Sequence, residues 1–267
     1  TLSLHEALPI YDKLSPRAGA RFVAKVLRFN PNLGIAELDV GGGQNVFLNL
    51  KRKPIEQGKL VVVEWIAPAL NDKQAVVKLV NAAPEGKPRL LQDGPDAFER
   101  AMKYGIASAR VSTPAQQKRV AELGMEAELH SGMPDLFELI DLNTQIADLQ
   151  DRVVELKGGG SLVFDRTEVG HVIDVNSGTA ENMGDLNKRA LQEVARQIRL
   201  RNLSGIILID VVGDRKRNPK TLLDTLGAAV KGDNCQVDIY GITKLGLVEC
   251  TRMRRGYELS SLLASGL

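Results

Sequence analysis

Short apolar runs separated by turn residues dominate the first third of the chain. Five such runs, rich in Val, Ile, Leu and aromatic residues, follow one another: RFVAKVLRF, GIAELDV, QNVFLNL, KLVVVEWIA and QAVVKLV. Gly41, Gly42 and Gly43 lie between two of them and no helical pattern follows, so they predict a hairpin turn with positive φ, not a phosphate-binding loop. Five strands in about sixty residues predict a small OB-like β-barrel over residues 18–82.

Helical patterns follow a stretch of Pro, Gly and charged residues at 83–95, which we interpret as a linker. PDAFERAMKYG and STPAQQKRVAELG each combine an early proline with a later glycine, which is typical of helix starts and stops. Further on, apolar residues recur at helical spacing: Phe137, Ile140, Ile146, Leu149 and Val153. We therefore predict a helical connecting region over 96–157 whose apolar stripe is packed.

Strands and long helices alternate after residue 158. The predicted order is strand, strand, helix, strand, helix, strand, strand. The two helices would bury one face each: Ala190, Leu191, Val194, Ala195 and Ile198 in the first, and Leu222, Leu223, Leu226 and Val230 in the second. The fold class is therefore α/β (α+β): a small OB-like β-barrel followed by an α/β layer with a mixed sheet over 158–255.

The two ends of the chain carry little pattern. Residues 1–17 predict an unstructured leader; their first ten residues also resemble a translated sequencing-library adapter, so they do not enter the fold prediction. Residues 256–267 are interpreted as a C-terminal tail.

Composition favours a globular chain. The 267 residues are 43% hydrophobic, enough for a sizeable core, and they contain neither an apolar run of 18 residues nor a basic leader before an apolar block. We therefore expect a cytoplasmic protein without a membrane span. Cys235 and Cys250 lie in apolar, strand-like segments without metal spacing, and predict buried thiols.

Charge is unevenly distributed although the net charge is only +2. Residues 188–255 contain fourteen Lys and Arg against seven Asp and Glu, a difference of +7. A basic segment of this kind fits a polyanionic partner, whereas its helical members, Lys188, Arg189, Arg196 and Arg199, could equally form a solvated helix face.

Two predicted strands of the α/β layer end in a carboxylate. Asp174 closes HVID, Asp210 closes GIILID, and Asn176 follows the first by two residues. Ligands bind at the carboxyl ends of strands in α/β sheets, and an acid that ends a buried strand needs a partner. Such an oxygen-rich corner suits Mg²⁺, which takes one or two carboxylates and keeps several waters.

Three blocks carry a family resemblance: TEVGHVIDVNSG, ARQIRLRNLSGIILIDVV and GITKLGLVECTRMR. In this order they resemble the catalytic core of the ribonuclease E/G family, endoribonucleases that cut single-stranded RNA. The barrel is similar, more weakly, to the S1-type RNA-binding domain of that family. The resemblance implies that Asp174 and Asp210 bind Mg²⁺ (or Mn²⁺), that Asn176 orients one of them, and that the products carry a 5′-phosphate and a 3′-hydroxyl.

RNA binding would combine stacking on an aromatic residue with contacts from basic side chains. The candidates are Phe47, Lys25 and Arg28 in the barrel, and Lys244, Arg252 and Arg254 near the last strands; Phe47 could equally be a core residue. His171 is interpreted as a satisfied strand histidine rather than a partner of the aspartates, and Asp214 as a turn residue rather than an outer ligand.

The chain departs from the family pattern at four places. There is no room between Val80 and Asp96 for the insertion that senses a 5′-monophosphate, and Gln236 replaces an arginine of the same pocket. No cysteine follows Cys250, so we expect no zinc and no zinc-linked oligomer, and leave a homodimer open. Glu37 replaces a second RNA-binding aromatic residue and would repel phosphate. An RNA-binding protein with little turnover is therefore the alternative to an endoribonuclease.

Overall fold

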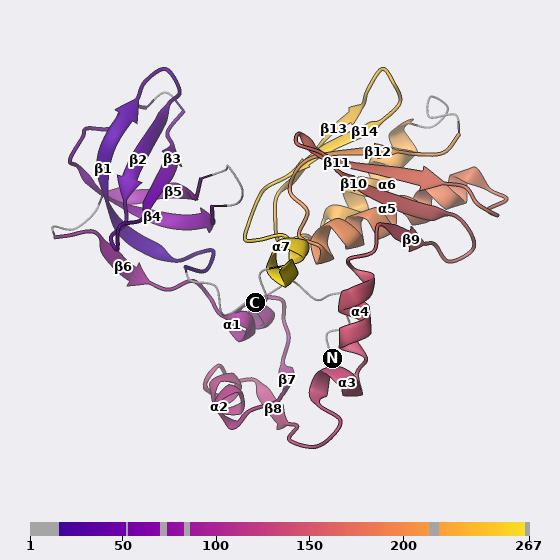
Figure 1. Ribbon diagram of the computed structural model, residues 1–267, viewed down its shortest axis with the longest axis horizontal. Coiled ribbons are helices and arrows are strands. Elements are labelled where there is room, and N and C mark those ends of the chain that lie inside the picture. The colour runs from indigo at the N-terminus through magenta and orange to yellow at the C-terminus, as the bar shows by residue number, and fades with distance from the viewer. Residues whose placement is uncertain (1–15, 52, 70–73, 83–85, 214–218, 265–267) are drawn as a thin grey trace. The chain divides into compact units, whose positions relative to one another are not determined.

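A computed structural model describes residues 16–51, 53–69, 74–82, 86–213 and 219–264 (Figure 1). The described residues form two compact units, one made of 16–130 with 255–257 and the other of 131–254 with 258–264. We call them the barrel unit and the α/β unit. Most of the expected leader lies outside the described residues, as does Asp214.

The barrel unit begins with a closed β-barrel. Its strands are β1 (Arg21–Asn30), β2 (Ile35–Asp39), β3 (Asn45–Asn49), β4 (Leu60–Ala67) and β5 (Val76–Ala82). They pair in the order β2-β3-β5-β4-β1, and β1 also pairs with β2, which closes the barrel. The β3–β5 pairing is parallel and the others are antiparallel. The predicted OB-like barrel is confirmed.

Successive residues of a strand point to opposite faces, so every second side chain points into the barrel. Most of these inward-pointing side chains are small or branched. Trp65 is 1% exposed and lies 5.9 Å from the ring of Phe22, so it is a core residue. Gly41, Gly42 and Gly43 all have positive φ, as the hairpin turn requires. A sixth strand, β6 (Arg89–Gln92), extends the sheet beside β1 within the segment that we expected to be a linker.

A small mixed segment completes the barrel unit. It consists of α1 (Ala97–Lys103), β7 (Ser108–Val111), α2 (Pro114–Glu122) and β8 (Glu126–Leu129), and its two strands are parallel. Thr113 caps α2, with Pro114 in its first turn and Gln116 completing a capping box. The region 96–157 is therefore not purely helical, because short apolar runs such as ASARV form strands that the helical pattern did not reveal.

The predicted helical stripe after Pro134 is also broken. The chain forms two short helices, α3 (Leu136–Leu139) and α4 (Leu142–Asp148), and then strand β9 (Val153–Glu155). Asp141 has a φ of 52° between the helices, which interrupts the helical path. Within the α/β unit Leu149 is buried, but Phe137, Ile140 and Val153 are each more than 40% exposed, so the stripe is not packed as we expected.

A six-stranded mixed sheet forms the centre of the α/β unit. After β9 come β10 (Ser161–Arg166), β11 (Gly170–Asn176), α5 (Met183–Leu200), β12 (Gly205–Asp210), α6 (Pro219–Val230), β13 (Val237–Ile242) and β14 (Val248–Arg252). The strand order is β13-β14-β12-β11-β10-β9, and only β11 and β12 are parallel. The predicted order and the mixed α/β layer are confirmed.

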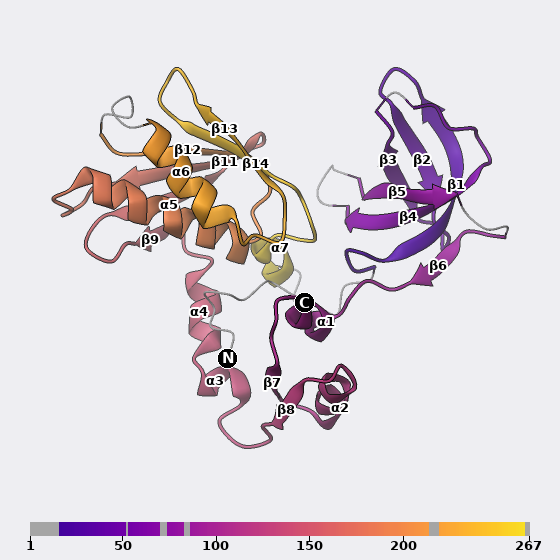
Figure 2. The ribbon, with the colours of Figure 1, turned by 180° about the vertical axis from the view of Figure 1, so that it is seen from behind.

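The sheet has two unlike faces. Helices α5 and α6 lie side by side along one of them, which we call the helix face (Figures 1 and 2). The core there includes Ile173, Val175, Ile207, Ile209 and Val248 from the strands and the predicted apolar stripe of α5. The alternate strand positions point to the opposite face, which we call the open face, and they are half-buried or exposed.

The last described helix, α7 (Leu259–Ala264), belongs to the α/β unit. Its Leu259 and Leu262 are buried, and the Leu259 N–H donates to the Arg201 carbonyl at 3.0 Å. The expected tail is therefore packed over this stretch. Across the described parts of the chain, no helix is long and apolar enough to cross a membrane.

Candidate functional site

Asp174 and Asp210 lie directly opposite each other on the open face. They are register partners at the carboxyl ends of the parallel strands β11 and β12. Their neighbours Ile173 and Ile209 are fully buried on the helix face, so alternation points both carboxylates away from the helices. Strand spacing places their Cα atoms about 4.8 Å apart. The structure thus brings the two predicted acids to one half-buried corner.

Asn176 extends this corner by one alternate position along β11 and is exposed. Two carboxylates and one amide oxygen match the hard oxygen donors that Mg²⁺ or Mn²⁺ prefers, with water completing the coordination. The described residues contain no cluster of three or more His, Cys, Asp or Glu side chains that could hold a metal ion. The donor set therefore fits a cation that needs few protein ligands, and does not fit a closed structural site.

Asn187 holds the chain just beyond Asp210. This residue of α5 is buried; its Nδ2 donates to the Val212 carbonyl at 2.8 Å, and its Oδ1 accepts from the Val212 N–H at 3.0 Å. The two bonds fix the carboxyl end of β12. We did not predict this role; an asparagine next to Leu186 on the buried side of a helix is the signal that could have indicated it.

A glycine turn packs against the end of β11, where Asn176 lies. Gly158, Gly159 and Gly160 all have positive φ. A Cβ atom on Gly160 would lie 2.8 Å from the Asn176 carbonyl oxygen and 2.6 Å from Leu186 Cδ1. The turn therefore packs closely against the chain at the end of β11, and only glycine fits there.

His171 does not contact the aspartates. It is buried, and its Nε2 lies 3.3 Å from Glu258 Oε1, while Arg166 Nη1 donates to Glu258 Oε2 at 3.0 Å. This confirms that His171 is a satisfied strand histidine. Both cysteines are buried as predicted, and burial raises the pKa of the Cys250 thiol to about 12, which makes it unreactive.

The predicted RNA contact by Arg252 is wrong for the folded chain. Arg252 is 1% exposed, and its guanidinium donates to both carboxylate oxygens of Asp233 at 2.9 Å, to Asn202 Oδ1 at 2.8 Å and to the Leu203 carbonyl at 3.0 Å. The alternation of β14 turns this side chain to the helix face. Lys244 is exposed and Arg254 is half-buried; contact of either with RNA stays a prediction.

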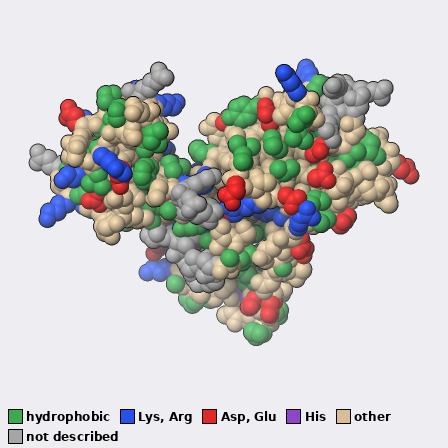
Figure 3. All heavy atoms as spheres, turned by 45° about the horizontal axis from the view of Figure 1, so that its top comes forward, with side chains coloured by type: hydrophobic (Ala, Val, Ile, Leu, Met, Phe, Trp, Pro, Cys, Tyr) green, Lys and Arg blue, Asp and Glu red, His purple; other side chains and the backbone are tan. Residues whose placement is uncertain are grey.

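Arg189 and Arg196 of α5, and Arg201 directly after this helix, make contacts within the protein. Arg189 donates to the carbonyls of Gly158 and Gly159, and Arg196 donates to Glu193 at 2.8 Å. Arg201 stacks over the Phe164 ring at 4.4 Å, and burial lowers its pKa to about 10. All three lie on the side of the sheet away from the aspartates. In Figure 3 basic and acidic side chains are interspersed on the face shown, not gathered into one basic area.

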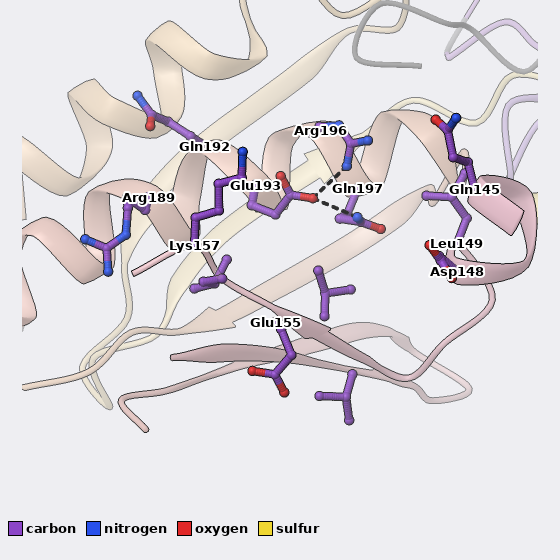
Figure 4. Close-up of a pocket in the computed structure, with 13 residues that line it drawn as sticks. Gln145, Asp148, Leu149, Glu155, Lys157, Arg189, Gln192, Glu193, Arg196 and Gln197 are labelled. Atoms are coloured by element: carbon purple, nitrogen blue, oxygen red, sulfur yellow. Dashed lines mark hydrogen bonds and ion pairs between the residues drawn. The ribbon is translucent and has the colours of Figure 1, made fainter. Parts of the chain in front are cut away.

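A hollow of about 640 Å³ lies on this helix side, between α4, β9 and α5 (Figure 4). Its charged lining residues balance, with Lys157, Arg189 and Arg196 against Asp148, Glu155 and Glu193. Glu193 already accepts hydrogen bonds from Arg196 and Gln197. Because its charges cancel and the sheet separates it from Asp174 and Asp210, we do not assign it to the candidate site.

In the barrel, three residues that we expected to affect RNA binding lie in one row across neighbouring strands. Arg28 on β1 is the register partner of Glu37 on β2, which is the partner of Phe47 on β3. Arg28 Nε donates to Glu37 Oε2 at 2.5 Å, and Asn45 Nδ2 donates to Oε1 at 3.1 Å. Phe47 is half-buried and Lys25 is exposed. The Glu37 charge, which we expected to repel RNA, is therefore offset by one of our candidate RNA-binding cations.

Comparison with known proteins gives a consistent result. The model of the Ribonuclease E/G family matches residues 73–255, more than half of the chain. Ribonuclease G of Salmonella typhimurium (strain SL1344) is 36% identical over 154 residues, which cover 55% of this chain and 32% of the relative. Ribonuclease E of Escherichia coli (strain K12) is 32% identical over 173 residues, which cover 62% of this chain and 15% of the relative.

A third relative matches a longer segment of this chain. Ribonuclease E of Synechocystis sp. (strain ATCC 27184 / PCC 6803 / Kazusa) is 31% identical over 198 residues, covering 66% of this chain and 29% of the relative. The matched segments thus span a third or less of the length of these relatives. The family match includes β11 and β12, which carry the facing aspartates, together with α5, β13 and β14. The chain belongs to the ribonuclease E/G family.

Proposed function

We propose that this protein is a metal-dependent endoribonuclease that hydrolyses single-stranded RNA. The observation that carries the proposal is the placement of Asp174 and Asp210 as register partners on the open face, in a chain of the ribonuclease E/G family. We further propose Mg²⁺ as the cation, Mn²⁺ as its substitute, and products with a 5′-phosphate and a 3′-hydroxyl.

The corner suits this chemistry because phosphodiester hydrolysis brings a nucleophile to an already anionic centre. A divalent cation bound there would lower the pKa of a water and offset negative charge on the phosphate. Asp174 and Asp210 would bind the cation and fix its position. Asn176 would orient the first carboxylate or bind the phosphate through its amide group, and the bonds from Asn187 to Val212 would keep Asp210 in place.

The barrel would hold the RNA strand. Stacking of a base on Phe47 is tolerant of sequence, and Lys25 is exposed for contact with phosphate. The alternative is an RNA-binding protein of the same family with little turnover. It is favoured by Glu37, which engages Arg28 beside Phe47 and leaves the row without net positive charge.

Cleavage of a labelled, unstructured single-stranded RNA in Mg²⁺ tests the proposal. We expect discrete cuts that disappear in EDTA and in the Asp210→Asn and Asp174→Asn variants, with a loss of at least about 100-fold, because removing a ligand of the cation removes several kcal/mol of charge stabilisation. Asp224→Asn is the matched control, since this acid is exposed on α6, which covers the opposite face of the sheet.

RNA that is retained in a filter-binding assay but stays intact in Mg²⁺ and in Mn²⁺ would favour the alternative. Equal cleavage of a DNA copy of the same strand would contradict the proposed specificity for RNA.

We also propose that the protein does not sense the 5′ end of its substrate. Gln236, which replaces the family arginine, donates its amide to both carboxylate oxygens of Asp238 at 2.9 and 3.0 Å, and so holds an acid where a phosphate would need a cation. RNAs with a 5′-monophosphate and with a 5′-hydroxyl should be cut at rates within about twofold of each other. A strong preference for the monophosphate would overturn this proposal.

A further inference from the structure

An exposed aromatic side chain lies on the same face as the two aspartates. Tyr240, on the edge strand β13, is 64% exposed. Its hydroxyl group lies 3.2 Å from Thr251 Oγ1 on β14, within hydrogen-bond distance. Thr251 occupies an open-face position, since its neighbours Cys250 and Arg252 are buried on the helix face. The contact therefore anchors the tyrosine ring on the open face and leaves most of the ring accessible.

Register places this ring near the corner. Strand β14 lies between β13 and β12, so Tyr240 is two strand spacings, about 10 Å, from the strand that ends in Asp210. Leu208 on β12 is opposite Glu249 on β14, which is opposite Gly241 on β13. Asp210 therefore lies about three residues, roughly 10 Å, further along the sheet than the Tyr240 backbone, and the Tyr240 hydroxyl reaches back to Thr251, which is opposite Ile206. The two displacements together separate Tyr240 from Asp210 by roughly 14 Å. A few nucleotides of a single strand can bridge that distance.

We propose that Tyr240 is a stacking site for a nucleobase close to the cleaved phosphate of the RNA, an inference that rests on the proposed function. The charges of the open face favour stacking over a further cationic contact. Asp238 and Glu249 flank Tyr240, so a phosphate placed directly at this ring would meet two acidic neighbours. A nucleobase is neutral, and its face can stack on tyrosine without meeting these charges.

The orientation of the Tyr240 ring supports the proposal that it stacks on a nucleobase. The contact with Thr251 favours one orientation of the ring before the RNA arrives, which lowers the entropy cost of stacking. Tyr240 also lies at the irregular register between Ile239 and Gly241, where the edge strand departs from regular pairing.

Photocrosslinking tests the inference without requiring cleavage. The Asp210→Asn variant, which lacks one of the two facing charges and should not cut, is irradiated in Mg²⁺ with single-stranded RNAs that carry 5-iodouridine at successive positions. Crosslinked peptides are identified by mass spectrometry. We expect one or two neighbouring positions to crosslink to Tyr240. If these RNAs bind and none crosslinks there, the inference is wrong; a protein partner, and not a base, would then be the candidate for this surface.

Variants provide the second measurement. Tyr240→Ala should weaken RNA binding by about 5- to 150-fold, the range that aromatic stacking contributes per base. Tyr240→Phe keeps the ring and should retain most of the affinity, and Tyr240→Leu keeps apolar area without the aromatic face and should resemble Tyr240→Ala. Leu245→Ala is the control, because it removes another exposed apolar side chain, 81% exposed, from the same hairpin.

The outcomes separate this inference from the proposed function. If the wild type cuts RNA and Tyr240→Ala has an unchanged KM and affinity, the inference fails and the endoribonuclease proposal stands. If the wild type does not cut RNA but Tyr240 crosslinks and Tyr240→Ala binds more weakly, the inference stands and the proposed activity fails. Thermal unfolding of each variant shows whether a weak binder is still folded.

Discussion

Acidic side chains in two places of the α/β unit have opposite surroundings: Asp233 lies in the segment before β13, and Asp174 and Asp210 lie on β11 and β12. At the helix face, the Asp233 side chain is 2% exposed and receives two hydrogen bonds from Arg252, whose own side chain is fully buried. On the open face, the residue opposite Asp174 is a second carboxylate, Asp210. One group is an ion pair inside the protein, and the other brings two like charges together at its surface.

This difference distinguishes charged residues that stabilise the fold from charged residues that are candidates for function. A buried ion requires a partner, because an unpaired charge in the interior costs several kcal/mol. Like charges directly opposite each other in a sheet repel each other, and a cation bound between them would offset that repulsion. A count of charges along residues 188–255 cannot make this distinction, and it led us to place Arg252 on the RNA-binding surface.

The buried pair should show the largest effect on stability. Arg252→Met leaves Asp233 charged and unpaired in the interior, so the free energy of unfolding should fall by about 3–5 kcal/mol. Urea denaturation measures this change. Lys244→Met, at an exposed position, should stay within about 0.5 kcal/mol of the wild type. Equal stability of the two variants would show that Arg252 is not the structural residue described above.

The glycine turn behind Asn176 should show the next largest effect. Gly160→Ala places a Cβ atom 2.8 Å from the Asn176 carbonyl oxygen at a φ of 90°, and should lower the free energy of unfolding by about 1–3 kcal/mol. RNA cleavage should fall as well, because the end of β11 must move. In Gly158→Ala the nearest atom is 3.5 Å away, on the flexible Arg189 side chain, so only the φ cost of about 1 kcal/mol remains. Identical losses in both variants would rule out the close packing as the cause.

The facing aspartates should respond to a cation. Adding Mg²⁺ should raise the melting temperature of the wild type and leave that of Asp210→Asn unchanged, because only a folded chain with both acids binds the ion. Stabilisation of both proteins to the same degree would place the Mg²⁺ elsewhere.

The smallest effect on stability should come from the exposed ion pair of Arg28 and Glu37 in the barrel. The Arg28 side chain is 75% exposed, so a double-mutant cycle of Arg28→Ala and Glu37→Gln should give a coupling energy of only about 0.2–1 kcal/mol. RNA affinity should be more informative. Glu37→Gln releases Arg28 to bind phosphate and should strengthen binding, whereas Arg28→Ala exposes the acid and should weaken it. Affinities that do not change in either variant would show that this row does not contact RNA.

Much of the fold could be predicted because its signals are local. Alternating apolar runs gave the five barrel strands, and Thr113 with Pro114 marked the start of α2. The apolar stripe of α5 is buried as its spacing predicted. The same local pattern misled us after Pro134, where Asp141 breaks the helix and the stripe remains exposed within its unit.

The sequence by itself determined that an aspartate lies at or near the carboxyl end of two strands, since strand period and the place of an acid near a strand end depend only on nearby residues. Tertiary structure alone decided which residues became neighbours. It placed Asp174 opposite Asp210, Arg28 beside Glu37, Arg252 inside the protein and Tyr240 on the open face. These contacts depend on the register between strands and on which face the helices cover, and both are set by packing between segments distant in the chain.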